Sequence, residues 1–169
     1  TDRAAGGNGA HPLALTVAGD RVFFQANDGV SGYELWVSDG TAAGTVLLKD
    51  IYPGSNSSTP YNFTAVGDRV LFAANDGASG AEVWVSDGTA AGTILVKDIY
   101  PGSGSATPSY LKTLGDRVYF QAGDGTNGNE LWVSDGTAAG TTMVEDINPG
   151  SVNTAPEKLT AAGDRLFFT

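Results

Sequence analysis

The chain has 169 residues, no cysteine, and 19 acidic against 9 basic residues, which gives a net charge of −10. The lack of cysteine excludes disulfide bridges and thiolate metal sites, and the few Lys and Arg argue against a nucleic-acid partner, because phosphate binding needs clustered cations. No apolar run approaches the roughly 18 residues of a membrane-spanning helix, so we expect no insertion into a membrane.

Two sequence motifs recur every 48 residues along most of the chain. The first is Gly-Asp-Arg followed by apolar residues, and the second is Leu/Val-Trp-Val-Ser-Asp-Gly-Thr. The first occupies 19–24, 67–72, 115–120 and 163–168, and the second 35–41, 83–89 and 131–137. A constant period near 50 indicates a repeat architecture, in which each unit buries its apolar faces only against its neighbours.

One repeat, residues 59–106, shows the elements in order. Short apolar runs separated by Gly-Asp, Asn-Asp-Gly and Asp-Gly-Thr predict four β-strands joined by three tight links. The predicted strands are 61–66, 69–74, 82–86 and 93–99. A longer Pro/Gly/Ser-rich crossover, 100–108, leads to the next repeat. Each repeat is therefore predicted to be an antiparallel meander.

The predicted strands are apolar on both faces. In the fourth strand we expect Ile94 and Val96 to face one way and Leu95 and Ile99 the other, and in the third strand the valines oppose Trp84. A sheet that must bury both faces is sandwiched between other sheets. Four-stranded sheets of about 40–50 residues stacked in this way are β-propeller blades, so we predict an all-β propeller fold.

By count, the chain carries three full blades and a half blade. The predicted units are a Gly-rich segment 1–12, blades at 13–58, 59–106 and 107–154, and a half blade with the first two strands at 155–169. An open arc would expose an apolar blade face at each end. We therefore expect either a segment of a longer protein, which we favour, or self-association of open arcs.

The Glu-Leu-Trp-Val-Ser-Asp-Gly-Thr run at 34–41 resembles the ELWxxDGT repeat family of bacterial extracellular proteins, often labelled hyalin-like. Further matches occur at 82–99, where Val83 replaces Leu, and at 130–147, where Glu145 replaces Lys. The resemblance covers nearly everything after residue 12. It implies propeller blades and an extracellular or cell-surface location, and it carries no established activity.

Two repeated residue types are predicted to be structural. The tryptophans alternate with Val and Leu, which favours packing between blades over a stacking platform for sugars. The aspartate before each Gly-Thr pair is expected to cap backbone N–H groups in an Asx turn. These structural residues are Trp36, Trp84, Trp132, Asp39, Asp87 and Asp135.

The loop before each third strand gathers oxygen ligands, and Ca²⁺ prefers six to eight of them. A calcium site in each blade is therefore one interpretation. The spacing matches no EF-hand, and Asn27 becomes Gly123 in the third repeat, so we favour turn-forming residues instead. The residues of the calcium hypothesis are Asp28, Glu34, Asp76, Glu82, Asp124 and Glu130, and no other cofactor is expected.

The positions that vary within the constant frame are the candidates for ligand binding, since propellers bind through loops at the ends of a rigid scaffold. Tyr33, Tyr61 and Tyr110 are the aromatic residues among them that we expect to be exposed. Neutral variation of solvent-facing loops remains an alternative.

Catalysis has little support. The single histidine, His11, lies outside the repeats, so Ser-His-Asp and Cys-His arrangements cannot form within them. We predict a non-catalytic extracellular scaffold for protein–protein contact or assembly. A lectin-like propeller that binds carbohydrate is the first alternative, and a secreted hydrolase is the second.

Overall fold

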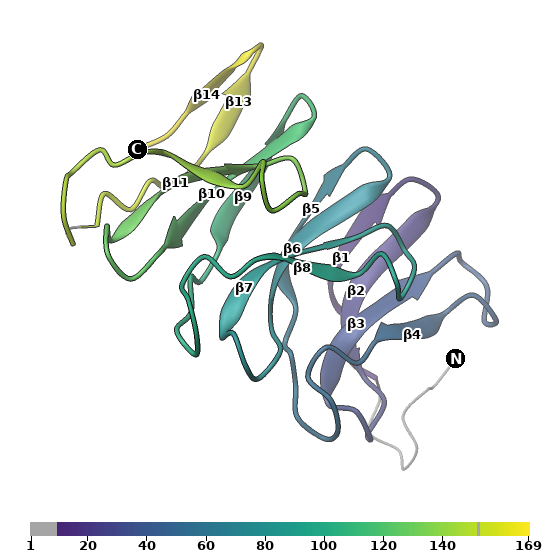
Figure 1. The fold of residues 1–169 in the computed structure, drawn as a ribbon. Coiled ribbons are helices and arrows are strands. Elements are labelled where there is room, and N and C mark those ends of the chain that lie inside the picture. The colour runs from purple at the N-terminus through teal and green to yellow at the C-terminus, as the bar shows by residue number, and fades with distance from the viewer. Residues whose placement is uncertain (1–9, 152) are drawn as a thin grey trace.

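The computed structural model describes residues 10–151 and 153–169. In this part the strands form three four-stranded antiparallel sheets and one two-stranded sheet (Figure 1). The sheets follow one another in chain order, and the strands of each sheet lie in the order of the sequence. The chain is therefore all-β, with three β-propeller blades and a half blade, as the repeat predicts. Residues 1–9 of the predicted Gly-rich segment lie outside the described residues.

The blades share one set of strand lengths. Blade 1 holds β1 (Leu13–Ala18), β2 (Arg21–Asn27), β3 (Tyr33–Ser38) and β4 (Val46–Lys49). Blade 2 holds β5 (Tyr61–Val66), β6 (Arg69–Asn75), β7 (Ala81–Ser86) and β8 (Ile94–Lys97). Blade 3 holds β9 (Ser109–Leu114), β10 (Arg117–Gly123), β11 (Asn129–Ser134) and β12 (Thr142–Glu145), and the half blade holds β13 (Thr160–Ala162) and β14 (Arg165–Phe167).

The fourth strand is shorter than predicted. In blade 2 it ends at Lys97, and the N–H of Ile99 donates to the Glu82 carboxylate at 2.9 Å instead of to a neighbouring strand. The chain turns at this point, so Ile99 packs in the same cluster as Val96, while Leu95 packs in another. The prediction that Val96 and Ile99 face opposite ways is wrong, because strict alternation stops where the strand stops.

Each sheet has two apolar faces, which we name by the neighbour they meet. The leading face, toward the preceding blade, carries Phe72 and Trp84 in blade 2. The trailing face, toward the following blade, carries Val83, Val96 and Ile99. The valines of β7 thus oppose Trp84, as predicted.

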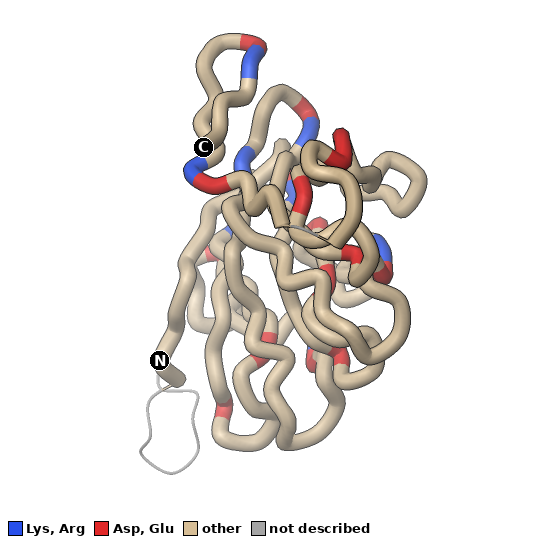
Figure 2. The backbone as a smooth tube through the Cα atoms, turned by 90° about the vertical axis from the view of Figure 1, so that its left-hand side faces the viewer, with Lys and Arg blue, Asp and Glu red and all other residues tan. Residues whose placement is uncertain are grey.

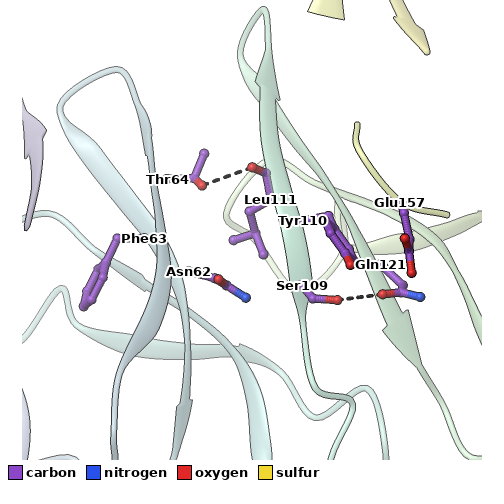
Figure 3. Close-up of a pocket in the computed structure, with 8 residues that line it drawn as sticks. All are labelled: Asn62, Phe63, Thr64, Ser109, Tyr110, Leu111, Gln121 and Glu157. Carbon is purple, nitrogen blue, oxygen red and sulfur yellow. Dashed lines mark hydrogen bonds between the residues drawn. The ribbon is translucent and has the colours of Figure 1, made fainter. Parts of the chain in front are cut away.

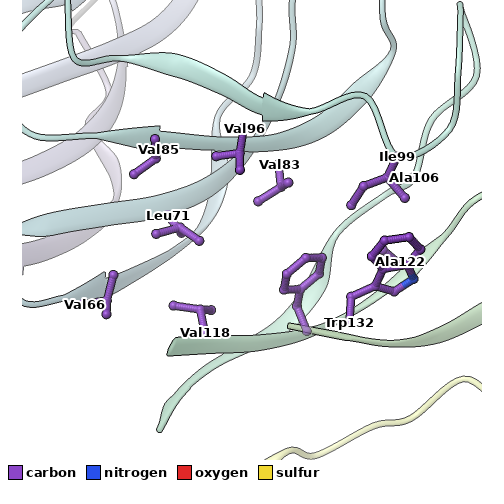
Figure 4. Close-up of a cluster of buried hydrophobic side chains, with 11 residues drawn as sticks. Val66, Leu71, Val83, Val85, Val96, Ile99, Ala106, Val118, Ala122 and Trp132 are labelled. Carbon is purple, nitrogen blue, oxygen red and sulfur yellow. The ribbon is translucent and has the colours of Figure 1, made fainter. Parts of the chain in front are cut away.

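Two seams join the blades, and each closes a trailing face against a leading face. The seam between blades 2 and 3 brings Val83, Val96 and Ile99 against Phe120 and Trp132 (Figure 4). The seam between blades 1 and 2 repeats the arrangement with the residues one repeat earlier. Each blade therefore stabilises its neighbour, as the repeat architecture requires.

Polar contacts cross the same seams and set the position of one blade on the next. Arg and Lys side chains of one blade donate to backbone carbonyls in the turn of the next blade. The contacts are Arg21 to Gly88 (2.6 Å), Lys49 to Thr93 (2.7 Å), Arg69 to Asp135 (3.1 Å) and Lys97 to Thr141 (2.8 Å). The recurrent cations thus hold neighbouring blades together.

The outer faces of the arc are less covered. On the leading side of blade 1, Leu13, Leu15 and Val17 of β1 are exposed. On the trailing side of blade 3, Ile147 is 46% exposed, whereas its counterpart Ile99 at the inner seam is 4% exposed. Burial at these positions depends on the neighbouring blade.

Acidic positions are spread along loops and hairpins, several of them beside a Lys or Arg (Figure 2). Arg21 lies 3.8 Å from Asp20, but this pair is solvent-exposed, and the guanidinium also donates to the carbonyl of Gly88. Across residues 10–151 and 153–169, the structure holds no helix of the length and apolar character needed to cross a membrane.

Candidate functional site

A groove of about 580 Å³ opens between the first strands of blades 2 and 3 (Figure 3). Its lining mixes two aromatic rings and one leucine side chain with amide, hydroxyl and carboxylate groups. The lining residues are Asn62, Phe63, Thr64, Ser109, Tyr110, Leu111, Gln121 and Glu157. The groove is the candidate ligand site of the described residues, because it concentrates side chains that differ between repeats.

Two hydrogen bonds join the walls of the groove and one orders its floor. The Asn62 amide donates to the Pro108 carbonyl at 3.1 Å, and the Thr64 hydroxyl donates to the Leu111 carbonyl at 3.4 Å. The Ser109 hydroxyl donates to the side-chain oxygen of Gln121 at 2.7 Å, and Gln121 is buried. Groups held in this way are preorganised to meet a polar ligand.

A left-handed residue occurs near the start of every first strand, and two of these residues line the groove. Asn62 and Tyr110 both have φ of 54°, and the equivalent Ala14 and Lys158 have 56° and 53°. Left-handed conformation is unfavourable for non-glycine residues and interrupts regular strand pairing. In all three full blades the register shifts at this point. The distortion recurs, while the side chain it presents changes from blade to blade.

Sequence analysis named Tyr110 as a candidate but missed the repeat position that it shares with Ala14, Asn62 and Lys158. Its signal was visible, since Ala14, Asn62, Tyr110 and Lys158 vary inside a constant frame. The positive φ could not be inferred from that variation, because none of the four is glycine. The groove also depends on the spacing of two blades, which a single repeat does not determine.

The three tyrosines predicted for ligand binding do not come together. Tyr110 is exposed and lines the groove. Tyr61 is half-buried in β5, and its burial, together with the charge of Glu82, raises the pKa of its hydroxyl. Tyr33 lies at the start of β3, where its backbone N–H donates to the Ser57 hydroxyl at 2.9 Å. Tyr110 alone of the three contributes to the groove.

A buried glutamate recurs at the start of each third strand. Glu34, Glu82 and Glu130 are all fully buried. The Glu34 carboxylate accepts the N–H of Ile51 at 2.8 Å, and both the N–H and the hydroxyl of Ser58, at 2.7 and 2.6 Å. These bonds tie both ends of the crossover after β4 to the middle of the sheet. The glutamate therefore holds the blade-to-blade connection in place.

Blade 2 keeps this glutamate but lacks the hydroxyl. Glu82 accepts the N–H groups of Ile99, Tyr100 and Ala106 at 2.9, 3.3 and 3.0 Å. Burial raises the pKa of Glu82 from 4.5 to about 7, against the lowering effect of these bonds and with a further rise from the charge of Asp98. The pKa of Glu34 is also raised by burial, while the Ser58 hydroxyl opposes the rise.

In blade 3 the same bonds are longer. Glu130 accepts the N–H of Ile147 at 3.3 Å and that of Thr154 at 3.2 Å. The Thr154 hydroxyl is buried without a hydrogen-bond partner, unlike the Ser58 hydroxyl of blade 1. The connection after β12 is therefore held less tightly than its counterparts.

In each blade, the two acidic residues of the calcium hypothesis have separate roles in the structure. Asp28 accepts the N–H groups of Val30 and Ser31 at 2.8 and 2.7 Å within its own loop, whereas Glu34 binds the crossover. Partial burial alone would raise the pKa of Asp28, but these hydrogen bonds lower it below its usual value. The pairs in the other blades, Asp76 with Glu82 and Asp124 with Glu130, bond in the same way.

The described residues contain no group of three or more His, Cys, Asp or Glu side chains that could hold a metal ion. One oxygen of the aspartate at each fourth-strand end is nevertheless buried without a hydrogen-bond partner, in Asp50, Asp98 and Asp146. The charges of Asp50 and Asp98 contribute to the raised pKa values of the nearby glutamates. In blades 1 and 2, the aspartate and the buried glutamate are therefore two neighbouring carboxyl groups in the connection between blades.

The Asp-Gly-Thr turn is closed by its own side chains. Asp87 accepts both the N–H and the hydroxyl of Thr89, at 2.8 and 2.7 Å, and these bonds lower its pKa. Asp39 and Asp135 make the same bonds. A Cβ at Gly92 would collide with the Asp87 carboxylate, so any other residue there would displace that carboxylate from its bonds to Thr89.

The tryptophans are buried at the leading face of each blade. Trp84 and Trp132 close the two seams, and Trp36 packs with Phe24 and Ala26 on the outer side of blade 1. Their rings are therefore unavailable as a sugar-stacking surface. His11, the single histidine, is exposed ahead of β1.

Comparison with solved structures gives a similarity to a designed protein. No family model and no curated protein matches the sequence. The solved structure of the computationally designed Ika8 protein aligns with 96% of this chain at 21% identity and a TM-score of 0.48. The chain spans 44% of that designed chain.

Proposed function

We propose that this chain is a non-catalytic repeat scaffold of a bacterial extracellular or cell-surface protein, and that it makes protein–protein contacts through the open faces of its outer blades. The observation that carries the proposal is the exposure of Leu13, Leu15 and Val17 on β1 and of Val144 and Ile147 beyond the second seam. Monomeric soluble proteins rarely leave clustered apolar side chains uncovered, and such surfaces mark interaction sites.

The repeated acids support the scaffold role. Glu34, Glu82 and Glu130 hold the connections between blades, and Asp39, Asp87 and Asp135 close turns. Each has the same role in every blade, which is expected of structural residues. The extracellular location rests on the resemblance of 34–41 and its copies to the ELWxxDGT repeats.

Self-association of the 169-residue chain tests the proposal. Sedimentation velocity over a range of concentrations should show association for the wild type. The double variant Leu15→Asp, Val17→Asp should weaken it, because charges on an exposed strand oppose burial. Val30→Asp, at an exposed apolar position in a loop, is the matched control. A wild-type chain that stays monomeric, and that binds no protein exposed on the same cell surface, would contradict the scaffold function.

Carbohydrate binding is the second candidate function, and the groove between β5 and β9 favours it. Tyr110 presents an aromatic ring beside the polar groups of Gln121, Asn62 and Glu157, a combination that suits sugar hydroxyls and ring faces. A glycan array should then show binding that Tyr110→Ala removes. Tyr33→Ala is the control, since Tyr33 lies outside the groove. Binding that survives Tyr110→Ala would exclude the groove as the sugar site.

A further inference from the structure

The groove between blades 2 and 3 contains a buried amide group whose N–H donors have no partner among the described residues. Gln121 of β10 is 8% exposed, and its side-chain oxygen accepts the Ser109 hydroxyl at 2.7 Å. Its amide nitrogen donates to no residue of 10–151 or 153–169, and it points away from Ser109 (Figure 3). Buried donors in proteins normally have an acceptor. This N–H group is therefore available to a ligand in the groove.

The residues around this amide occur together in blade 3 alone among the described blades. Ser109 orients the glutamine, and the next residue, Tyr110, presents an aromatic ring. The counterparts of Ser109, Tyr110 and Gln121 are Leu13, Ala14 and Gln25 in blade 1, and Tyr61, Asn62 and Ala73 in blade 2. The structural residues of this chain recur in every blade. A combination found in one blade is therefore not required by the fold.

The rest of the lining supplies acceptors and apolar contacts. Asn62 donates its amide N–H to the Pro108 carbonyl, and its side-chain oxygen accepts nothing from the described residues. The exposed Glu157 carboxylate is likewise unbonded within them. Tyr110 is 43% exposed, and Leu111 is partly buried beside it. The groove thus offers one buried donor, two acceptors, an aromatic ring and an aliphatic side chain.

The charge of the lining narrows the chemistry of the ligand. Glu157 is its one ionisable group of negative charge, and the lining includes no Lys or Arg. An anionic sugar would meet a like charge and no compensating cation, which is unfavourable for binding. The volume of about 580 Å³ is within the range of small-molecule sites. A neutral ligand that carries both acceptors and donors therefore fits best.

We propose that this groove binds an N-acetylated amino sugar, whose acetamido carbonyl accepts the Gln121 N–H. The acetamido N–H and the ring hydroxyls donate to the Asn62 oxygen and the Glu157 carboxylate. The sugar ring packs on Tyr110, and the acetamido methyl packs on Leu111. A secondary amide with a methyl group combines the acceptor, the donor and the apolar surface that this lining requires. The inference rests on the carbohydrate-binding candidate function, since it names the class of sugar.

The first experiment measures the preference for the acetamido group. The probe is a fluorescently labelled trimer of N-acetylglucosamine with the linkage of chitin, and anisotropy reports its binding to the 169-residue chain. Unlabelled trimer then competes with cellotriose, the glucose trimer of the same linkage. The acetylated trimer should bind at least about tenfold more tightly, because cellotriose has hydroxyl groups in place of the acetamido groups.

The second experiment removes the donor. Gln121→Met keeps a side chain of similar length without an N–H, and it should reduce the preference for the acetylated trimer over cellotriose at least about tenfold. Gln25→Met is the matched control, because Gln25 is 7% exposed at the same position of blade 1 and lies outside the groove. It should leave the preference unchanged. Circular dichroism checks that both variants are folded.

Tyr110→Ala is a second variant at an exposed position, where misfolding is not expected. It should weaken the binding of both trimers, since it removes the ring on which either sugar packs. Gln121→Met and Tyr110→Ala therefore have different signatures, a lost preference and a general loss of affinity. A purely structural role of Gln121 would weaken both trimers equally and leave the preference intact.

Equal binding of the two trimers by the wild type would overturn acetamido recognition and leave carbohydrate binding standing. A preference that survives in a folded Gln121→Met variant would also overturn it, as would an equal loss in Gln25→Met. Binding of neither trimer would overturn the inference. If the glycan array is also blank, the carbohydrate-binding candidate fails with it, and the scaffold function is unaffected.

Discussion

The seam between blades 2 and 3 and the open face beyond blade 3 use the same repeat positions with opposite results. Phe120 is fully buried at the seam, whereas Phe168, one repeat later, is 40% exposed. Ile99 is buried, and Ile147 is not. The chemistry of each pair is identical, so the neighbouring outer hairpin decides the burial. In a repeat protein, stability therefore resides largely in the interfaces between units.

The largest contrast is expected from truncating the two phenylalanines. Phe120→Ala should lower the free energy of unfolding by about 3–5 kcal/mol, because it removes a buried ring from a closed seam. Phe168→Ala should lower it by less than about 1.5 kcal/mol, since much of that ring already faces solvent. Urea unfolding followed by tryptophan fluorescence measures both. Equal losses would mean that the half blade contributes as much as a full seam.

The buried glutamates extend the contrast to polar groups. Glu82→Ala leaves the N–H groups of Ile99, Tyr100 and Ala106 without their acceptor, and we expect a loss of about 1–3 kcal/mol. Glu130→Ala should cost less, because its bonds are longer and its crossover is partly exposed. The same unfolding experiment compares them, and a larger loss for Glu130→Ala would reverse the proposed order of tightness.

The cations across the seams give a smaller effect. Arg69→Ala removes a bond to the Asp135 carbonyl of the next blade and should lower stability by about 0.5–1.5 kcal/mol. Arg117→Ala, at the equivalent position before the half blade, should change stability little. Thermal unfolding of the two variants side by side checks this. If both variants lose the same amount, the contact between blades is not the cause.

The smallest expected effect is a pH dependence of stability that arises from Glu82 in blade 2. The pKa of Glu82 is raised to about 7, so the folded chain binds this proton more tightly than the unfolded chain does. The stability from this group is present below pH 4.5 and is lost as the pH rises to about 7. Ala106→Ser would supply the hydroxyl that Ser58 gives to Glu34, and it should lower the pKa of Glu82.

Ala106→Ser should therefore reduce the loss of stability between pH 5 and pH 8, by about 1 kcal/mol or less. Ser58→Ala, which removes the corresponding hydroxyl in blade 1, should enlarge that loss. Urea unfolding at the two pH values measures both changes. An unchanged pH dependence in Ala106→Ser would show that the missing hydroxyl does not set the pKa of Glu82.

The repeat could be predicted from the sequence because every blade needs the same strands, turns and buried faces. The Gly-Asp hairpins, the alternation of Val83 and Val85 with Trp84, and the Asp-Gly-Thr turns are local patterns, and they predict strands, links and the propeller fold. The turn function of Asp87 needs only residues within its own loop. Such features follow from spacing, so one sequence suffices to find them.

The candidate groove could not be predicted from the sequence in the same way, and neither could the hydrogen bonds between each buried glutamate and its crossover. The left-handed residues at Asn62 and Tyr110 are not glycines, so no residue type marks them. The hydrogen bond from the N–H of Ile99 to Glu82 lies where the fourth strand ends early, and it joins the crossover after β8 to β7. A strand prediction based on apolar alternation does not account for a side chain that accepts a backbone N–H in place of a neighbouring strand.

The sequence by itself determined the repeat, the four-stranded blades and the two apolar faces of each sheet, because period and alternation are properties of the chain. Only the tertiary structure decided which apolar residues are covered. Ile99 and Ile147 have the same local sequence role, yet one packs with Trp132 and Met143 and the other is exposed. Burial is a property of the neighbouring blade, and no single repeat encodes its neighbour.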